Sequence, residues 1–300
     1  MLLLKKFKRT HALRDGVTVH SRGGIGNQLF CLFAGLALAD KLDCRLYIDP
    51  SLHRYTAHLP FLVDQLIQES PNGLSGSVQC LQEPQTHLRR MIQRISIPRW
   101  CDFVETSFQF TPEFFATPKG SCAVGYFQSW RYLEAVRIER RNEVREAIKH
   151  LAESSVSFRP DDIVIHVRRG DYLKPSVREI HGILPYRYYS EAITKLRAAG
   201  QHGRVWAVCE DRLVDLRTLE NEICDSVIQV DSASLWTDLQ SLMSSPSLVL
   251  ANSTFSWMAG WLNEGTRPVV APRPWFLAEK YDTRDLIPPH WTVVEHQFRD

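Results

Sequence analysis

The amino-acid sequence predicts an α/β protein built from two domains, each with a parallel β-sheet. Strand-like and helix-like segments alternate in both halves of the chain, a pattern typical of parallel sheets whose strands are joined by helices. The 300 residues are about twice the length of a domain of roughly 150 residues. Hydrophobic residues make up 44% of the chain and charged residues 23%, a globular composition that excludes disordered, collagenous and coiled-coil chains.

The first half begins with a strand, a glycine-rich turn, a helix and a second strand. Residues 17–20 alternate as a strand does, residues 21–27 form the turn, and residues 44–48 return to a strand. The apolar content of residues 28–41 indicates the helix between them. Residues 50–117 show weak periodicity and scattered proline and glycine, so we expect an irregular region with short helices.

The first half closes with a strand at residues 122–126 and an amphipathic helix at residues 129–151, where apolar residues recur at helical spacing. Residues 153–162 are polar and contain Pro160, which predicts a domain boundary there. The predicted domains are residues 1–152, with a basic arm at residues 1–15, and residues 153–300.

The second half alternates between strands and helices more regularly than the first half. Its predicted strands cover residues 163–167, 204–209, 227–230, 248–251 and 269–270. Its predicted helices cover residues 186–199, 213–222, 235–243 and 255–262. A proline- and tryptophan-rich tail follows the last strand.

The charge balance does not suggest a nucleic-acid partner, and none is predicted. Net charge is +2, from 36 basic and 34 acidic residues that are interspersed over most of the chain. The exception is the start, where five basic residues precede the first acidic residue, Asp15. This segment is either a solvated arm or a peripheral contact with anionic membrane lipid.

The remaining composition predicts a cytoplasmic protein. The longest apolar run, residues 29–39, spans 11 residues, whereas a membrane-spanning helix needs about 18 to 20. Asp15 and the glycine-rich turn separate this run from the basic start, which does not fit a signal peptide. Seven cysteines without a C-x-x-C pair predict neither a disulfide framework nor a zinc ribbon.

Three segments follow predicted strands, where open parallel sheets bind ligands. The first is Gly23-Gly-Ile-Gly-Asn-Gln-Leu29. Its glycines allow a phosphate to approach the backbone, and the following helix supplies N–H donors. Leu29 stands where a dinucleotide fingerprint needs its last glycine, so that fingerprint is excluded. The loop is either an anion cradle, with the Asn27 amide at its edge, or a tight turn.

The second segment, His166-Val-Arg-Arg-Gly-Asp-Tyr172, closes the strand at residues 163–167. Adjacent residues at a strand end point to opposite faces, so one arginine reaches a ligand while the other turns to an acid such as Asp171. A guanidinium matches a diphosphate and offsets the negative charge of a departing nucleotide. The alternative is a surface ion-pair cluster, although two arginines at the end of a buried strand are costly without a partner.

The third segment, Asn252-Ser-Thr-Phe-Ser-Trp-Met-Ala-Gly-Trp-Leu262, follows the strand at residues 248–251. Ser253 and Thr254 can cap the helix and present hydroxyl and N–H groups to a ligand. Helix capping with core aromatic residues explains the same pattern. The segment therefore supports a ligand site only together with the other two.

Several kinds of site are excluded by missing motifs. The chain has no D-x-D and no His, Cys and carboxylate set at metal-ligand spacing, so no metal is predicted. It has no G-x-S-x-G and no G-x-x-x-x-G-K-[ST], which excludes an α/β-hydrolase and an ordinary P-loop nucleotide triphosphatase.

The stretches GGIGNQLF, HVRRGDY and NSTFSWMAGWL, in this order, resemble the inverting α-1,2-fucosyltransferases of glycosyltransferase family 11. Residues 125–130, 181–193 and 238–243 are similar to further family segments. The resemblance implies a GT-B-like architecture, in which two Rossmann-like parallel-sheet domains face each other across a crevice. It also implies an acceptor-side first domain, a second domain that binds the donor GDP-fucose, a galactose-terminated glycan as acceptor, and no cofactor or metal.

The resemblance implies a donor site assembled from all three segments. Arg168 holds the donor pyrophosphate, and Arg169 supports it. The other implied donor-binding residues are His166, Gly24, Gly26, Asn27, Ser253, Thr254, Phe255, Glu210 and Asp211. The last two match an acidic pair of the family that contacts the base or ribose, and a solvated turn is the alternative interpretation of them.

The implied reaction displaces GDP from the anomeric carbon of fucose with inversion. The sugar ring becomes cationic while GDP takes up negative charge, which Arg168 and the helix N-termini stabilise. The base that takes the acceptor proton is not identified. Asp171, His166 and His181 are candidates, and departure of the leaving group without a base is the alternative.

Four residues depart from the family pattern, namely Met258, Gly260, Cys31 and Leu32. They occupy packing positions, so the class of enzyme that the resemblance implies is unaffected. The identity of the acceptor and the linkage are left open. The alternatives are a GDP-fucose transferase of α-1,3 or α-1,6 linkage, and a non-catalytic nucleotide- or sugar-binding protein. A dehydrogenase is disfavoured by Leu29.

Overall fold

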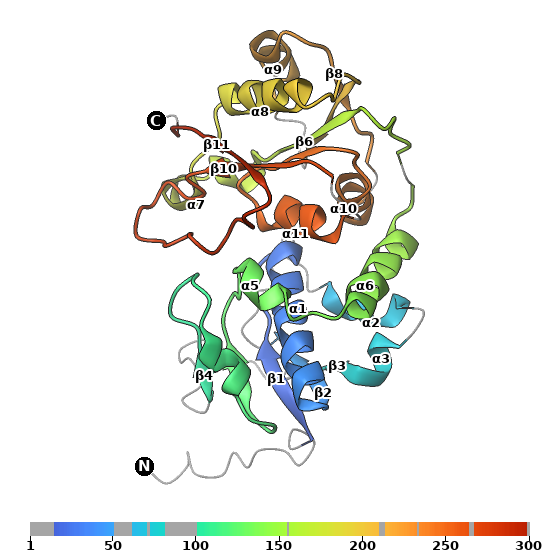
Figure 1. Ribbon diagram of the computed structural model, residues 1–300, viewed down its shortest axis with the longest axis vertical. Coiled ribbons are helices and arrows are strands. Elements are labelled where there is room, and N and C mark those ends of the chain that lie inside the picture. Colours follow the sequence, from blue (N-terminus) through green and yellow to red (C-terminus); the bar gives the residue numbers. More distant parts are fainter. Residues whose placement is uncertain are drawn as a thin grey trace. The chain divides into compact units, whose positions relative to one another are not determined.

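The computed structural model describes residues 15–50, 62–70, 73–81, 101–154, 156–209, 214–232, 234–263 and 267–298 (Figure 1). The chain divides into two compact units, Met1–Ala147 and Ile148–Asp300. The boundary predicted from the sequence, after residue 152, falls just beyond the helix that this division cuts. Apart from Asp15, the basic arm lies outside the described residues.

The first unit contains a parallel β-sheet. Its strands are β1 (Gly16–His20), β2 (Arg45–Asp49), β3 (Val78–Cys80), β4 (Phe103–Val104) and β5 (Cys122–Val124). The strand order is β3-β2-β1-β5-β4, and every neighbouring pair of these described strands is parallel. From β1 the chain runs outward through β2 to β3, then crosses to β4 at the other edge and returns to β5 beside β1.

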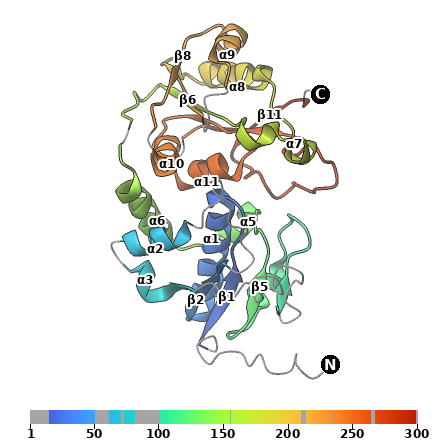
Figure 2. The ribbon, with the colours of Figure 1, turned by 180° about the vertical axis from the view of Figure 1, so that it is seen from behind.

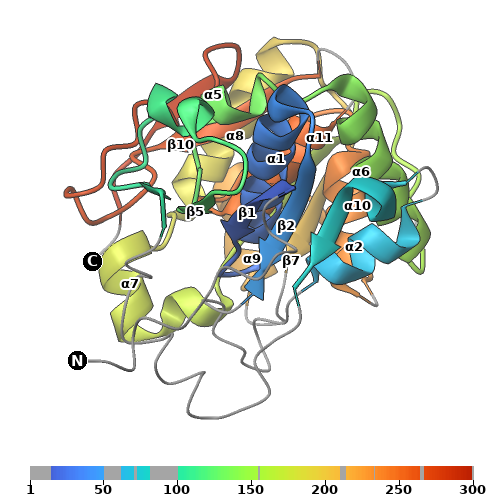
Figure 3. The ribbon, with the colours of Figure 1, turned by 90° about the horizontal axis from the view of Figure 1, so that it is seen from below.

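The longest described helix of the first unit is α1 (Ile25–Leu42), which runs along β1 and β2 (Figure 3). The others are α2 (Val63–Glu69), α3 (Leu74–Ser77), the 3₁₀ helix η4 (Pro112–Ala116), α5 (Trp130–Leu133) and α6 (Ile138–Leu151). Gly35 lets α1 approach the sheet, because a Cβ atom there would lie 2.7 Å from a methyl group of Leu46. The helix ends at Asp43, which adopts a left-handed backbone with φ 46°.

Helix α1 is longer than its uninterrupted apolar run suggests. Among the described residues it is the one helix whose length and composition would let it cross a membrane, and 78% of its apolar window is buried. Its buried positions include 12 consecutive residues, from Gln28 to Ala39. This burial fits the central helix of a folded unit, packed against a sheet.

The second unit contains a parallel sheet of six strands. They are β6 (Ile163–Val167), β7 (Val205–Cys209), β8 (Val227–Gln229), β9 (Leu248–Val249), β10 (Val269–Arg273) and β11 (Thr292–Glu295). The order is β11-β10-β9-β6-β7-β8, with every neighbouring pair parallel. This is the strand order of doubly wound, Rossmann-type sheets, whose switch point lies between β6 and β9. The predicted α/β class with two parallel sheets is thus confirmed.

Helices cover both faces of this second sheet. They are the 3₁₀ helix η5 (Gly170–Leu173), α7 (Pro175–His181), α8 (Tyr186–Ala198), α9 (Leu216–Ile223), α10 (Leu235–Met243) and α11 (Thr254–Leu262). Helices α8 and α9 lie on one face, and α10 and α11 lie on the other (Figures 1 and 2). Burial on both faces explains why the central strands β6 and β9 are fully buried apolar runs.

The sequence predictions differ most from the structure in three places. The helix predicted over residues 129–151 is divided into α5 and α6, because the N–H of Val136 bonds to the carbonyl of Leu133 in a turn. No proline or glycine marks this break, so periodicity alone could not show it. The region predicted as irregular contains the short helices that we expected but also β3 and β4, and the tail contains β11.

Candidate functional site

The described part of the second unit brings together two of the three sequence segments. Strands β6 and β9 are neighbours, paired through Val164 with Leu248 and Ile165 with Val249. The segment after β6 and the segment between β9 and α11 therefore leave the same edge of the sheet. Because this edge is the switch point of a doubly wound sheet, it is the expected position of a ligand site.

The two arginines that follow β6 have different surroundings. Arg168 is 17% exposed, and its Nη2 donates to Asp171 Oδ1 at 2.7 Å. Its guanidinium also lies 5.3 Å from the ring centre of Tyr172. These contacts hold the charged group at the carboxyl edge of the sheet, next to solvent. The expected division, with one arginine facing a ligand and the other turned to Asp171, is therefore wrong, because Arg168 is the one that turns to Asp171 and Arg169 bonds to backbone carbonyls.

Arg169 is buried and bonds to the backbone. Its Nη2 donates to the carbonyl of Leu184 at 3.0 Å, and its Nη1 donates to the carbonyl of Arg168 at 3.1 Å. The guanidinium lies 4.8 Å from the ring centre of Tyr186 at the start of α8. Arg169 therefore fixes the path of the chain after β6.

His166 lies on β6 and is completely buried. Its ring centre is 5.6 Å from that of Phe255, the second residue of α11. Neither ring nitrogen has a hydrogen-bond partner among the described residues. Burial, assisted by the charge of Arg168, lowers the pKa of His166 to about 3, so the imidazole is neutral at pH 7. A buried polar group without a partner is rare and often marks a functional place.

Helix α11 begins at the switch point with a side-chain cap. Ser253 Oγ accepts the N–H of Phe255 at 3.3 Å, and Thr254 is the first helical residue. Asn252, just before it, donates from Nδ2 to the carbonyl of His181 at 2.7 Å. The helix thus directs the positive end of its dipole to the edge where Arg168 lies.

Tyr172 connects the segment after β6 to the start of α11. Its hydroxyl donates to the carbonyl of Asn252 at 2.9 Å, and its ring stacks on His181 with the ring centres 4.7 Å apart. Burial lowers the pKa of His181. The hydrogen bonds of Tyr172 and Asn252 thus connect the segment after β6, His181 and the start of α11.

The glycine-rich segment lies in the first unit, between β1 and α1. Gly23 has φ +80°, and a Cβ atom there would lie 2.4 Å from Asn27 Nδ2, so this turn requires glycine. Gly24 is the N-cap of α1, and no side chain caps the helix there. Gly26 is the second residue of α1, and Asn27 Oδ1 accepts a hydrogen bond from Gln128 Nε2 at 2.8 Å. The predicted role of this loop in binding the donor nucleotide stays a prediction.

Sequence reasoning missed Glu105, which follows β4 at the carboxyl edge of the first sheet. Its Oε2 accepts the N–H groups of Tyr126 at 2.7 Å and Phe127 at 2.8 Å. Burial raises the pKa of Glu105 to about 7. The segment containing it carried no strand signal, because β4 has two residues. Glu210 and Asp211 lie outside the described residues.

Known proteins are similar to this chain over most of its length. The model of glycosyl transferase family 11 matches residues 77–295. An alpha-1,2-colitosyltransferase of Escherichia coli is 26% identical over 293 residues, covering 93% of this chain and 99% of that protein. The O-antigen biosynthesis glycosyltransferase WbnK of Escherichia coli is 28% identical over 172 residues, covering 52% of this chain and 56% of that protein.

Among solved structures, the NodZ alpha-1,6-fucosyltransferase co-crystallised with GDP matches 83% of this chain and 93% of that chain, at 16% identity and a TM-score of 0.43. The family model alone covers well over half of the chain. Its match includes the whole segment after β6 and the whole segment before α11. The chain belongs to glycosyl transferase family 11.

Proposed function

We propose that the chain is an inverting α-1,2-fucosyltransferase, which moves L-fucose from GDP-β-L-fucose to the 2-hydroxyl of a galactoside. The observation that carries the proposal is Arg168, held by Asp171 at the switch point of the second sheet and beside the start of α11. Family membership supports the transfer of a sugar. The relative named for an α-1,2 linkage supports that linkage here.

The leaving GDP is stabilised by two sources of positive charge. The Arg168 guanidinium makes charge-assisted hydrogen bonds to pyrophosphate oxygens, and Asp171 and Tyr172 fix its orientation beforehand. The N-terminus of α11 adds the positive end of a helix dipole. Both act most strongly as the bond to the sugar breaks, because negative charge grows on GDP at that moment.

The nearby histidines and Asp171 serve in binding and positioning. His166 has a pKa lowered to about 3, so it is a weak base at pH 7 but can hydrogen-bond the nucleotide as a neutral imidazole. Asp171 is paired with Arg168. We infer that removal of the acceptor proton follows departure of GDP, and that no metal takes part in the transfer step because Arg168 and α11 supply the positive charge.

The acceptor in this proposal is a galactose-terminated glycan of a surface polysaccharide. Support comes from the relative that is named for O-antigen biosynthesis. We propose that the enzyme works in the cytoplasm, where the basic arm at residues 1–15 would contact the anionic inner face of the membrane. The donor sugar needs its own test, because colitose is L-fucose without the 3-hydroxyl group.

Thermal unfolding with a panel of nucleotides tests the donor. The full-length protein is heated with GDP, GDP-fucose, GDP-colitose, GDP-mannose, UDP-galactose or NAD, without added metal. A ligand that binds the folded state raises the midpoint, by about 2.7 kcal/mol at a hundredfold excess over its Kd. We expect GDP and GDP-fucose to stabilise the wild type and to have little effect on Arg168→Ala.

The matched control is Arg187→Ala, which removes an exposed arginine that pairs with Glu191 on α8. It should respond to GDP as the wild type does. A response to NAD alone would favour a dehydrogenase, and GDP-colitose as the best ligand would change the donor. Binding of GDP-fucose without transfer to any galactoside would favour a non-catalytic binding protein, and no response to GDP would refute the proposed donor site.

A further inference from the structure

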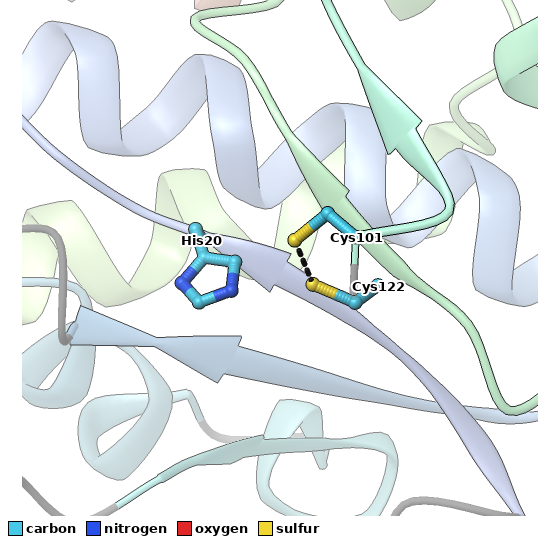
Figure 4. Close-up of side chains that lie close together, drawn as sticks. All are labelled: His20, Cys101 and Cys122. Carbon is cyan, nitrogen blue, oxygen red and sulfur yellow. Dashed lines mark hydrogen bonds between the residues drawn. The ribbon is translucent and has the colours of Figure 1, made fainter. Parts of the chain in front are cut away.

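Three side chains with metal-ligating atoms gather in the first unit. They are His20 at the end of β1, Cys122 at the start of β5, and Cys101 just before β4 (Figure 4). Their ligand atoms all lie within 4.8 Å of one another, and the two Sγ atoms are 2.7 Å apart. His20 is buried, and both cysteines are partly buried. The proposed transfer reaction uses none of the three.

The sheet holds these residues in place. Cys122 is the register partner of Thr18, and His20, two residues further along β1, points to the same face as Thr18. The N–H of Asp102 donates to the carbonyl of Cys122 at 2.9 Å, and the N–H of Cys122 donates to Asp102 Oδ2 at 3.0 Å. These two bonds fix the segment that carries Cys101 beside β5. Backbone pairing therefore sets the positions from which the three side chains meet.

An acidic residue orients the histidine toward the sulfur atoms. His20 Nδ1 lies 3.5 Å from Asp49 Oδ2, and Asp49 is the register partner of His20 on β2. Figure 4 shows one ring nitrogen on the side of the two sulfur atoms and the other turned away, so Nε2 is the nitrogen that faces the cysteines. A carboxylate that positions a histidine in this way is the usual outer partner of a metal-bound imidazole.

We propose that His20, Cys101 and Cys122 bind one Zn²⁺ ion, or a soft divalent ion of the same class, through Nε2 and two thiolates. On binding, each thiol releases its proton to solvent. The two thiolates then balance the 2+ charge of the ion, and a fourth position remains for water. Zinc–sulfur bonds of about 2.3 Å place two tetrahedral sulfur ligands about 3.8 Å apart, so the Sγ atoms must separate by about 1 Å, which rotation of the cysteine side chains allows.

A metal accounts for more of the arrangement than a disulfide does. A disulfide between Cys101 and Cys122 would use the two sulfur atoms alone, whereas the cluster also directs a carboxylate-oriented imidazole at them. The bound ion would connect β1, β5 and the segment that enters β4. Its role would be to stabilise the first unit, whereas Arg168, on which the proposed transfer depends, lies in the second unit.

Metal titration of the reduced, full-length protein tests this proposal. After treatment with EDTA and removal of the chelator, Co²⁺ is added and the absorption spectrum is recorded. We expect thiolate-to-cobalt charge-transfer bands and tetrahedral d–d bands that saturate at one equivalent and disappear when Zn²⁺ is added. Zn²⁺ should also raise the thermal midpoint of the wild type.

Cys101→Ser and Cys122→Ser should lose the bands and the response to Zn²⁺. Cys224→Ser is the matched control, because Cys224 is an exposed free cysteine at the end of α9 in the other unit, and it should behave as the wild type. If Cys122→Ser does not fold, the wild-type titration and Cys101→Ser still decide. Absence of the bands in the reduced wild type would overturn the proposal, as would unchanged bands in the Cys101→Ser variant, or a disulfide in a protein that binds no metal after reduction.

Discussion

At the scale of single residues, two neighbouring arginines differ in their contacts, and the proposal assigns only Arg168 to ligand binding. Arg168 is paired with an acidic residue that is itself partly exposed, whereas Arg169 is 8% exposed and bonds to two backbone carbonyls. The sequence motif places both at the end of a buried strand but cannot show which of them bonds to the backbone. That difference follows from the path of the chain at Leu184, which comes from a separate segment.

The two arginines should therefore respond oppositely to substitution. Arg169→Ala should lower the free energy of unfolding by about 1–3 kcal/mol, because the buried carbonyl of Leu184 loses its donor. Arg168→Ala should change the free energy of unfolding by no more than about 0.5 kcal/mol, yet weaken GDP binding. Urea unfolding of both variants, with and without GDP, measures this. Equal destabilisation by both substitutions would contradict the division of roles.

Glu105 should make the stability of the protein depend on pH. Its pKa is raised by burial from 4.5 to about 7, so the folded state favours the protonated form. The stability that the folded state gains from the raised pKa of Glu105 is fully present below pH 4.5 and is lost as the pH rises through about 7. The Glu105→Gln variant, which can accept the same two N–H groups, should gain stability relative to the wild type between pH 5 and pH 8. If the thermal midpoints of Glu105→Gln and the wild type differ by the same amount at pH 5 and at pH 8, the raised pKa of Glu105 is refuted.

At the scale of elements, Tyr172 joins the segment after β6 to the start of α11. Tyr172→Phe should lower the free energy of unfolding by about 1 kcal/mol, because it removes the hydrogen bond to Asn252, and should weaken GDP binding by loosening the two elements. Trp206→Phe is the comparison, since it removes a bond to Asp162, just before the amino end of β6. It should reduce stability and leave GDP affinity unchanged. Equal losses of GDP affinity in both variants would argue against a role of the Tyr172 hydrogen bond in GDP binding.

The elements that the sequence predicted well are those whose own residues form a clear hydrophobic pattern. Strand β6 and helix α10 were predicted with the bounds that they have, because a buried apolar run and an amphipathic period mark them. Strands β3, β4 and β11 have three, two and four residues, and their pairing with neighbouring strands, rather than their composition, makes them strands.

The candidate site was predictable in part for the same reason. Two of the three motifs follow β6 and β9, so strand prediction alone placed Arg168 and Ser253 at the carboxyl edge of a sheet. That these strands are neighbours depends on topology. The cluster of His20, Cys101 and Cys122 has no sequence spacing to reveal it, because the two cysteines are 21 residues apart and His20 lies on a different strand.

At the scale of the whole molecule, Arg168, on which the proposed transfer depends, and the proposed metal cluster belong to different units. Treatment with EDTA should therefore leave the rate of fucose transfer unchanged at temperatures well below unfolding, while it lowers the thermal midpoint. Measuring both in the same preparation separates the two effects. Loss of transfer on chelation, restored by a metal ion while the protein stays folded, would show that the reaction itself requires a metal.

The proposed function is defined by the bond that the enzyme makes. The most direct measurement is transfer from GDP-β-L-fucose, in the presence of EDTA, to methyl β-galactoside and to its 2-deoxy analogue, with the products identified by NMR. We predict one product, fucose α-linked to the 2-oxygen of the galactoside, and none from the 2-deoxy acceptor. Transfer to the 2-deoxy acceptor, a β-linked product, or fucose on another oxygen would contradict the proposed function.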